Sequence, residues 1–112
     1  MKPILALFVL LLYSCEAPLG VGSEAMLRND NPSIPVLVVV EKDTYSKLVK
    51  TVEARDDAGY RELFATGRVF SVTSNTKVLI IDQRLDMKQI RILEGPSRER
   101  AGWVHESRLW RK

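Results

Sequence analysis

The chain has 112 residues, of which 46% are hydrophobic and 28% are charged, and its formal net charge is +3. This length suits one domain with one modest core and excludes a multidomain architecture. The basic excess lies within residues 82–112, where both signs are interspersed, so the pattern favours a solvated surface over a nucleic-acid-binding face. Cys15 is the only cysteine, so no disulfide can form within the chain.

Residues 1–14 have the pattern of a secretion signal peptide. Lys2 supplies a positive charge, and Ile4–Tyr13 form an uncharged, apolar run of ten residues. A helix needs about 20 apolar residues to cross the hydrocarbon of a bilayer, so this run is too short for a membrane span. We therefore predict an exported protein.

Residues 12–15, Leu-Tyr-Ser-Cys, resemble the lipobox of bacterial lipoproteins, although Tyr13 is bulkier than the residue usually found there. The resemblance implies cleavage before Cys15 and attachment of diacylglycerol to its thiol, so that a palmitate analogue should label it. The protein would then be anchored in the cell envelope by lipid, in the inner or the outer membrane. The alternative is an ordinary signal peptide that is cleaved later, for example after Ala17 or Ala25.

The segment that follows, residues 15–33, is rich in glycine, proline and asparagine and has little periodicity. Such a composition predicts a flexible tether. We expect the folded domain to span residues 34–112.

The first half of that domain predicts one strand and a helical hairpin. Residues 34–40, IPVLVVV, are rich in β-branched side chains and read as a short strand. Asp43 or Thr44 can cap a first helix. Its apolar stripe is formed by side chains at helical spacing, namely Tyr45, Leu48, Val49 and Val52. Asp57 can cap a second helix over residues 58–66, which Gly67 would end.

Four strands are predicted after Gly67, at residues 68–72, 76–82, 88–95 and 102–107. The connections between them are short, and parallel pairing would need crossovers of a dozen or more residues, so the strands must be antiparallel. A tightly linked meander tends to close into a small barrel, which removes its exposed edges. The predicted fold is mainly β, a small antiparallel barrel preceded by two short helices.

This half of the chain resembles bacterial SH3-like domains. The similarity rests on Val-Leu-Ile-Ile-Asp at 78–82, Ile-Arg-Ile-Leu-Glu-Gly at 90–95, Gly-Trp-Val at 102–104 and a hydrophobic residue at Leu109. It implies an SH3-like barrel and says little about function. The loop before Gly-Trp-Val often carries a second glycine in that family, whereas here it is charged, so a partner of this loop would meet Arg98 and Arg100.

No catalytic or metal-binding pattern is present in the sequence. His105 is the only histidine, which excludes a two-histidine metal site and a Cys/His zinc site within one chain. The acidic pairs Asp56-Asp57 and Asp82/Asp86 are typical of helix caps and turns, and no phosphate-binding loop or nucleophile elbow occurs. We therefore predict no enzymatic activity, no metal and no cofactor.

The candidate binding surface consists of Arg98, Arg100, Trp103 and Trp110. Trp103 can serve either as a packing residue of the barrel or as a ligand platform, and Trp110 can cover the end of the barrel. The leading hypothesis is a membrane-tethered binding module that recognises a peptide, a cell-wall component or an envelope protein. The alternatives are a structural or accessory subunit of an envelope complex and, with least support, a hydrolase.

Overall fold

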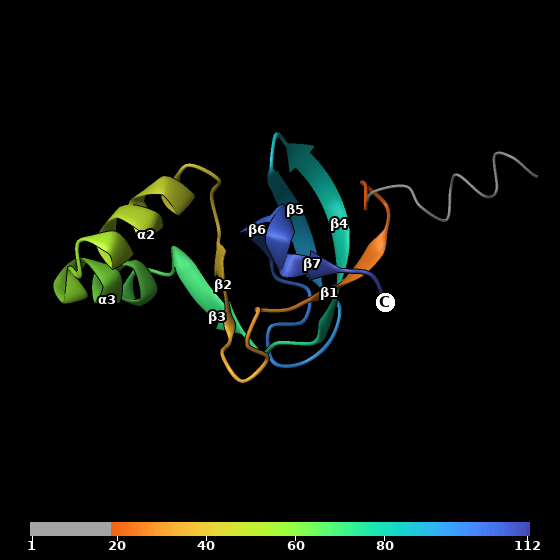
Figure 1. The fold of residues 1–112 in the computed structure, drawn as a ribbon, viewed down its shortest axis with the longest axis horizontal. Helices are drawn as coiled ribbons and strands as arrows, with labels where there is room; N and C mark the ends of the chain where they lie inside the picture. The colour runs from red at the N-terminus through yellow and green to blue at the C-terminus, as the bar shows by residue number, and fades with distance from the viewer. Residues whose placement is uncertain (1–18) are drawn as a thin grey trace, which may run out of the picture.

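The computed structural model describes residues 19–112. They form a mainly β domain with one antiparallel sheet of seven strands and two helices (Figure 1). The strands are β1 (Glu24–Leu27), β2 (Val36–Val39), β3 (Val69–Val72), β4 (Thr76–Arg84), β5 (Met87–Ile92), β6 (Ala101–His105) and β7 (Leu109–Trp110). The helices are α2 (Thr44–Glu53) and α3 (Asp57–Ala65), with a 3₁₀ turn, η1 (Glu106–Arg108), between β6 and β7. The predicted signal peptide and Cys15 lie outside the described residues.

The strand order is β3-β2-β6-β5-β4-β1-β7, and every pair is antiparallel. The prediction of a mainly β, antiparallel fold with two helices is confirmed. The sheet is open in its hydrogen bonding, with β3 and β7 at its two ends. No helix between residues 19 and 112 has the length and apolar character that crossing a membrane requires.

The prediction of a flexible tether over residues 15–33 is wrong where β1 lies. Residues 24–27 form β1, which lies between β4 and β7 and pairs with both. Ala25 and Leu27 point into the core and are fully buried. The strand is short, and its partners lie far along the chain, so the local composition hides it. The folded domain therefore begins before residue 34.

The predicted four-strand meander is correct only for β4, β5 and β6. β3 pairs with β2, from Val36 opposite Val72 to Val39 opposite Val69, and not with β4. The three-residue connection after β3 does not make a hairpin because Asn75, at φ 69°, donates its amide to the carbonyl of Leu27 in β1. The chain thus passes from β3, at one end of the sheet, to β4, which lies beside β1.

The helical hairpin forms as predicted, but neither helix is capped as expected: Asp43 precedes α2 without a side-chain cap hydrogen bond, and the cap of α3 is shifted by one residue. α3 is capped by Asp56, whose carboxylate accepts a hydrogen bond of 3.0 Å from the amide of Gly59, whereas the predicted cap, Asp57, lies in the first turn. A Cβ atom at Gly59 would lie 2.5 Å from Asp56 Oδ2, so a larger residue there would make the capping carboxylate shift. Gly67 ends the helix at a φ of 75°, as its position predicts.

Two hydrophobic cores explain why β2 and β3 are apolar on both faces. The first core takes side chains from β1 to β6, with Leu109 of β7 packed against it, so the sheet curves around this cluster. The second core lies between the sheet and the helical hairpin, and its buried members are Val39, Leu48, Leu63, Val69, Met87 and Trp103. Successive side chains of a strand point to opposite faces, so Val38 enters the first core and Val39 the second.

The joint between β2 and β6 depends on Gly102. A Cβ atom built there would lie 2.5 Å from Val38 Cγ1 and 2.7 Å from the carbonyl oxygen of Val39. The absence of a side chain therefore lets β6 approach β2, where Val39 pairs with Trp103. This contact joins the unit of β2, α2, α3 and β3 to the rest of the sheet.

Candidate functional site

A groove of about 230 Å³ runs between helix α2 and the sheet. Its lining combines an apolar floor with a few polar side chains, which are drawn from the β1–β2 connection, β2, α2 and the segment around η1: Asn29, Val36, Leu37, Tyr45, Leu48, Val49, Val52, Glu53, His105 and Arg108. A concave, mainly apolar surface with a small number of polar groups is typical of a ligand-binding site.

The apolar stripe of α2 forms the helical wall of this groove. Tyr45, Leu48, Val49 and Val52 recur at the spacing predicted for a buried face. Only Leu48 is buried, while Tyr45 and Val49 are half-buried and Val52 is 54% exposed. The stripe is therefore wider than the second core needs, and its outer part faces the groove.

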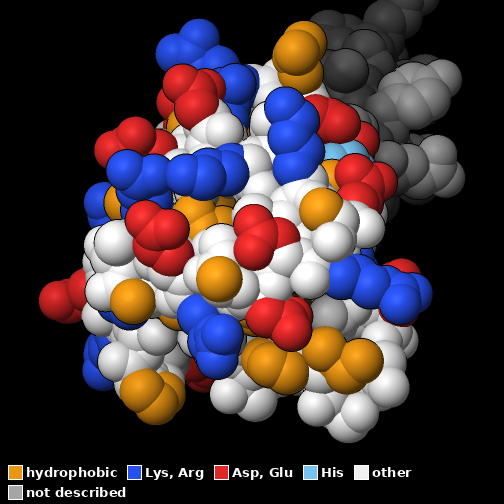
Figure 2. Space-filling model, turned by 90° about the vertical axis from the view of Figure 1, so that its left-hand side faces the viewer, with side chains coloured by type: hydrophobic (Ala, Val, Ile, Leu, Met, Phe, Trp, Pro, Cys, Tyr) orange, Lys and Arg blue, Asp and Glu red, His pale blue; other side chains and the backbone are white. Residues whose placement is uncertain are grey.

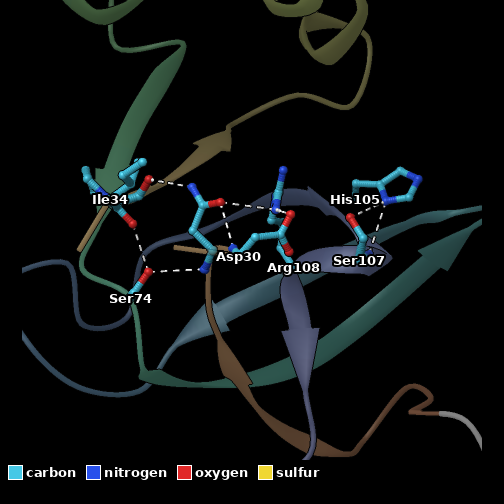
Figure 3. A network of polar contacts seen from close by, with 8 residues as sticks. Asp30, Ile34, Ser74, His105, Ser107 and Arg108 are labelled. Carbon is cyan, nitrogen blue, oxygen red and sulfur yellow. Dashed lines mark hydrogen bonds and ion pairs between the residues drawn. The ribbon is translucent and has the colours of Figure 1, made fainter. Parts of the chain in front are cut away.

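Asn29, which follows β1 two residues on, is the centre of a hydrogen-bond network at the polar rim of the groove, and Figure 3 shows this network between Ile34, Ser74 and Arg108. The Asn29 side-chain oxygen accepts from Arg108 Nη1 at 3.2 Å, its amide nitrogen donates to the carbonyl of Pro35 at 3.3 Å, and its backbone amide donates to Ser74 Oγ at 3.1 Å. Ser74 Oγ in turn donates to the carbonyl of Ile34 at 2.9 Å. The network ties the β1–β2 connection to both the β3–β4 turn and η1.

Arg108 is the cationic group of the groove. Its Nη1 lies 3.6 Å from Asp30 Oδ2 and donates to Asn29, and these are its only side-chain partners among residues 19–112. A guanidinium carries five N–H donors. Arg108 is thus positioned by its neighbours and keeps donors for an acceptor group of a ligand, such as a peptide carbonyl or carboxylate.

His105, just before η1, contacts two polar residues, Ser107 and Asp86. Its Nδ1 accepts from the backbone amide of Ser107 at 3.1 Å and lies 2.8 Å from Ser107 Oγ, and its Nε2 lies 3.1 Å from Asp86 Oδ2. Because Nδ1 accepts from a backbone amide, the neutral ring carries its proton on Nε2 and donates it to Asp86. The imidazole therefore acts as the N-cap of η1.

The structure does not bring the four predicted surface residues together. Trp103 is 9% exposed and packs in the second core against the helices, which is the packing role that the sequence left open. Arg100 is exposed, and its guanidinium lies 3.8 Å from the ring centroid of Phe70 in β3. Arg98 is exposed in the β5–β6 connection. These residues do not line the groove along α2.

Trp110 lies in β7, at the opposite end of the sheet from β3. It is 43% exposed and pairs with Met26 of β1. The guanidinium of Arg28 lies 4.9 Å from the centroid of its ring, a distance suited to a cation–π contact. One face of this indole is therefore already occupied by a side chain of the same protein.

The face that carries the helices shows no large region of a single charge (Figure 2). Lysine, arginine, aspartate and glutamate side chains alternate on it, with hydrophobic side chains between them. Within residues 19–112 no three histidine, cysteine, aspartate or glutamate side chains are grouped as metal ligands would be.

No protein-family model, curated protein or solved structure matches the chain. The groove residues Asn29, Val52 and Arg108 could not be selected from the sequence as a site. The one usable signal is the apolar stripe of α2, but its spacing of i, i+3, i+4 and i+7 is also the ordinary pattern of a helix that packs on a core, so the sequence does not show that part of it is exposed.

Proposed function

We propose that the protein is a non-enzymatic, lipid-anchored binding module of the cell envelope, built on an SH3-like barrel, and that the groove along α2 binds an extended apolar segment of an envelope protein. The groove itself is the observation that carries the proposal. It combines six apolar side chains with a positioned arginine at its rim.

The pairing of β1 supports an SH3-like barrel. β1 is hydrogen-bonded to both β4 and the short C-terminal β7, and a 3₁₀ turn precedes β7. β4 is nine residues long and its register shifts between Ile80 and Asp82, as expected of a bulged strand that bends around a barrel corner. One core takes side chains from every strand. The unit of β2, α2, α3 and β3 would then be an insertion between the first two barrel strands.

The size and polarity of the groove favour a peptide over a glycan. A volume of about 230 Å³ is below the roughly 300–1,000 Å³ of pockets that enclose a small molecule, so it suits one or two side chains of a chain lying across the surface. A sugar would present many hydroxyl groups. Asn29 and His105 already have partners, and Arg108 keeps donors for a single acceptor group, so most of these hydroxyls would lose their hydrogen bonds to water without replacement.

A selection of peptides from a random library, followed by binding measurements on purified protein, tests the groove. We expect the enriched peptides to carry aliphatic or aromatic side chains. Val52→Asp should weaken their binding about tenfold or more, because the contact of one buried aliphatic side chain is worth about 1.5–3 kcal/mol.

Val40→Asp is the matched control, since Val40 is 40% exposed and does not line the groove. Equal binding by both variants would refute the site. Failure to enrich any peptide, together with stoichiometric co-purification of one envelope protein, would favour the accessory-subunit alternative.

The lipid anchor is tested by metabolic labelling with a palmitate analogue. We expect label in the wild type and none in Cys15→Ser, and an unlabelled wild type would contradict the anchor. Cleavage after Ala25, the later of the two alternatives, would divide β1 and remove its pairing with Leu79 and Val78. The fold therefore favours processing before β1.

A further inference from the structure

The first described residue is fixed beside the β4–β5 hairpin. The carbonyl oxygen of Leu19 accepts a hydrogen bond of 2.8 Å from Lys88 Nζ, which also donates to Gln83 Oε1 at 2.6 Å. Lys88 is buried, and the side chain of Leu19 packs against the first core. Since Lys88 pairs with Gln83 next to the hairpin turn, the N-terminal segment joins the domain at the end of the sheet where this turn lies.

Two exposed apolar side chains lie on the two segments that this contact joins. Leu85, at the tip of the β4–β5 hairpin, is 92% exposed, and Val21, two residues after Leu19, is 61% exposed. Leu85 also has a φ of 55°, in the left-handed region where glycine and asparagine are favoured and a leucine is unusual. Its side chain adds little to the packing of the fold, so folding alone does not account for leucine here. A strained, exposed residue of this kind points to a role outside the fold.

The length of chain between Cys15 and Leu19 limits where a membrane can be. Four residues reach at most about 14 Å when fully extended, whereas a tether to residue 33 would have reached about 60 Å. If Cys15 carries the lipid, the end of the domain at Leu19 must lie close to the bilayer surface. This step rests on the lipid anchor of the proposed function.

We propose that the patch formed by Leu19, Val21 and Leu85, the N-terminal patch, rests on the lipid bilayer, with Leu85 entering the boundary between headgroups and acyl chains. The helices lie on the far side of the sheet from the start of the described chain and so project away from the membrane (Figure 1). The domain is thereby oriented with its helical layer available to partners in the envelope.

The contact is apolar and not electrostatic. The charged groups beside the tip are paired with one another, Asp82 with Arg84 at 3.9 Å and Asp86 with His105 at 3.1 Å. One leucine contributes too little for a free protein to bind vesicles, but the anchor holds it at a high effective concentration at the surface. The orientation should therefore need the lipid and should not depend on anionic headgroups or salt.

Depth-dependent fluorescence quenching tests this orientation. The lipidated protein is reconstituted into phosphatidylcholine vesicles that contain a lipid with a spin label near the headgroup. A dye is attached through Arg84→Cys, next to the tip, or through Ser46→Cys on the exposed face of α2. We expect several-fold stronger quenching at position 84 than at position 46, unchanged in 0.5 M NaCl. Adding Leu85→Asn, which suits the left-handed backbone and leaves the core intact, should abolish most of the difference.

Equal quenching at the two positions, or quenching at position 84 that Leu85→Asn does not change, would overturn the orientation. Absence of any contact in pure lipid vesicles would leave the N-terminal patch to a protein partner and would equally overturn it. Failure of the anchor gives a different result, because an unmodified Cys15 would react with a second dye molecule. One dye per chain, together with an intact mass that includes Cys15 and its lipid, shows that the thiol is occupied, whereas a chain cleaved after Ala17 would carry one dye and no lipid.

Discussion

Replacing Gly102 by alanine should separate β6 from β2 and destabilise the whole domain. The added methyl group would lie 2.5 Å from Val38 Cγ1 and 2.7 Å from the carbonyl oxygen of Val39. Favourable contacts between non-bonded heavy atoms lie near 3.5–4.0 Å, so the two strands must move apart by several tenths of an ångström or more. The backbone oxygen cannot rotate away as a side chain could. Overpacking of this kind costs about 1–3 kcal/mol, and we expect about 2 kcal/mol here.

Urea unfolding followed by tryptophan fluorescence measures this loss, since Trp103 is buried in the folded protein. A loss of about 2 kcal/mol would lower Tm by roughly 10 °C in a domain of this size. Gly20→Ala is the matched control because a Cβ there meets nothing within 4 Å. A Gly102→Ala protein that is as stable as the Gly20→Ala protein would refute the account of the β2–β6 joint.

Three further changes test other parts of the structure by urea unfolding. Leu85→Asn should raise the free energy of unfolding by roughly 0.5 kcal/mol, because asparagine tolerates the left-handed φ of 55°; a loss of stability would contradict this. Asp56→Ala should lower it by about 1 kcal/mol through loss of the α3 cap, and an unchanged value would show that the cap contributes nothing. A hydrogen bond and the charge of Lys112 lower the pKa of Glu24, so the carboxylate stabilises the fold above its unfolded pKa. Glu24→Gln should therefore be less stable at pH 7, with the difference vanishing as pH falls through about 4 and below; a difference that persists at pH 2 would contradict the assignment.

The sequence predicted the strands that carry continuous apolar runs and the presence of both helices, but not their caps, since Asp43 makes no side-chain cap hydrogen bond and Asp56 caps α3 in place of Asp57. The runs at 34–40 and 76–82 correspond to β2 and β4, and the short connections between β4, β5 and β6 imply their antiparallel pairing. These elements are local, because each is encoded by its own side-chain pattern and by the residues that bound it.

The pairing of β1 and β3 could not be predicted, because it depends on partners that are distant in the chain. β1 carries only two buried side chains, Ala25 and Leu27, among glycines and prolines that suggest a tether. β3 is followed by a connection short enough for a hairpin, yet Asn75 bonds to β1 instead. In both cases tertiary contacts decide the arrangement, and no local pattern reports them.

The candidate site shows the same division. The apolar stripe of α2 is visible in the sequence, but the exposed fraction of each side chain is not. Val52 lies outside the second core because of how α2 packs against α3 and the sheet. Asn29 and Arg108 meet across most of the chain through a hydrogen bond of 3.2 Å. The predicted surface residues Arg98, Arg100 and Trp110 lie outside the groove, and Trp103 is buried.

Amide chemical-shift mapping during titration with a selected peptide tests the central claim most directly, since it compares all surfaces at once. A binding site in the groove predicts the largest shifts in α2 (Thr44–Glu53), around Val36 and Leu37 of β2, and at Arg108. Shifts concentrated instead in the β5–β6 connection around Arg98 and Arg100, with α2 unchanged, would contradict the groove as the binding site.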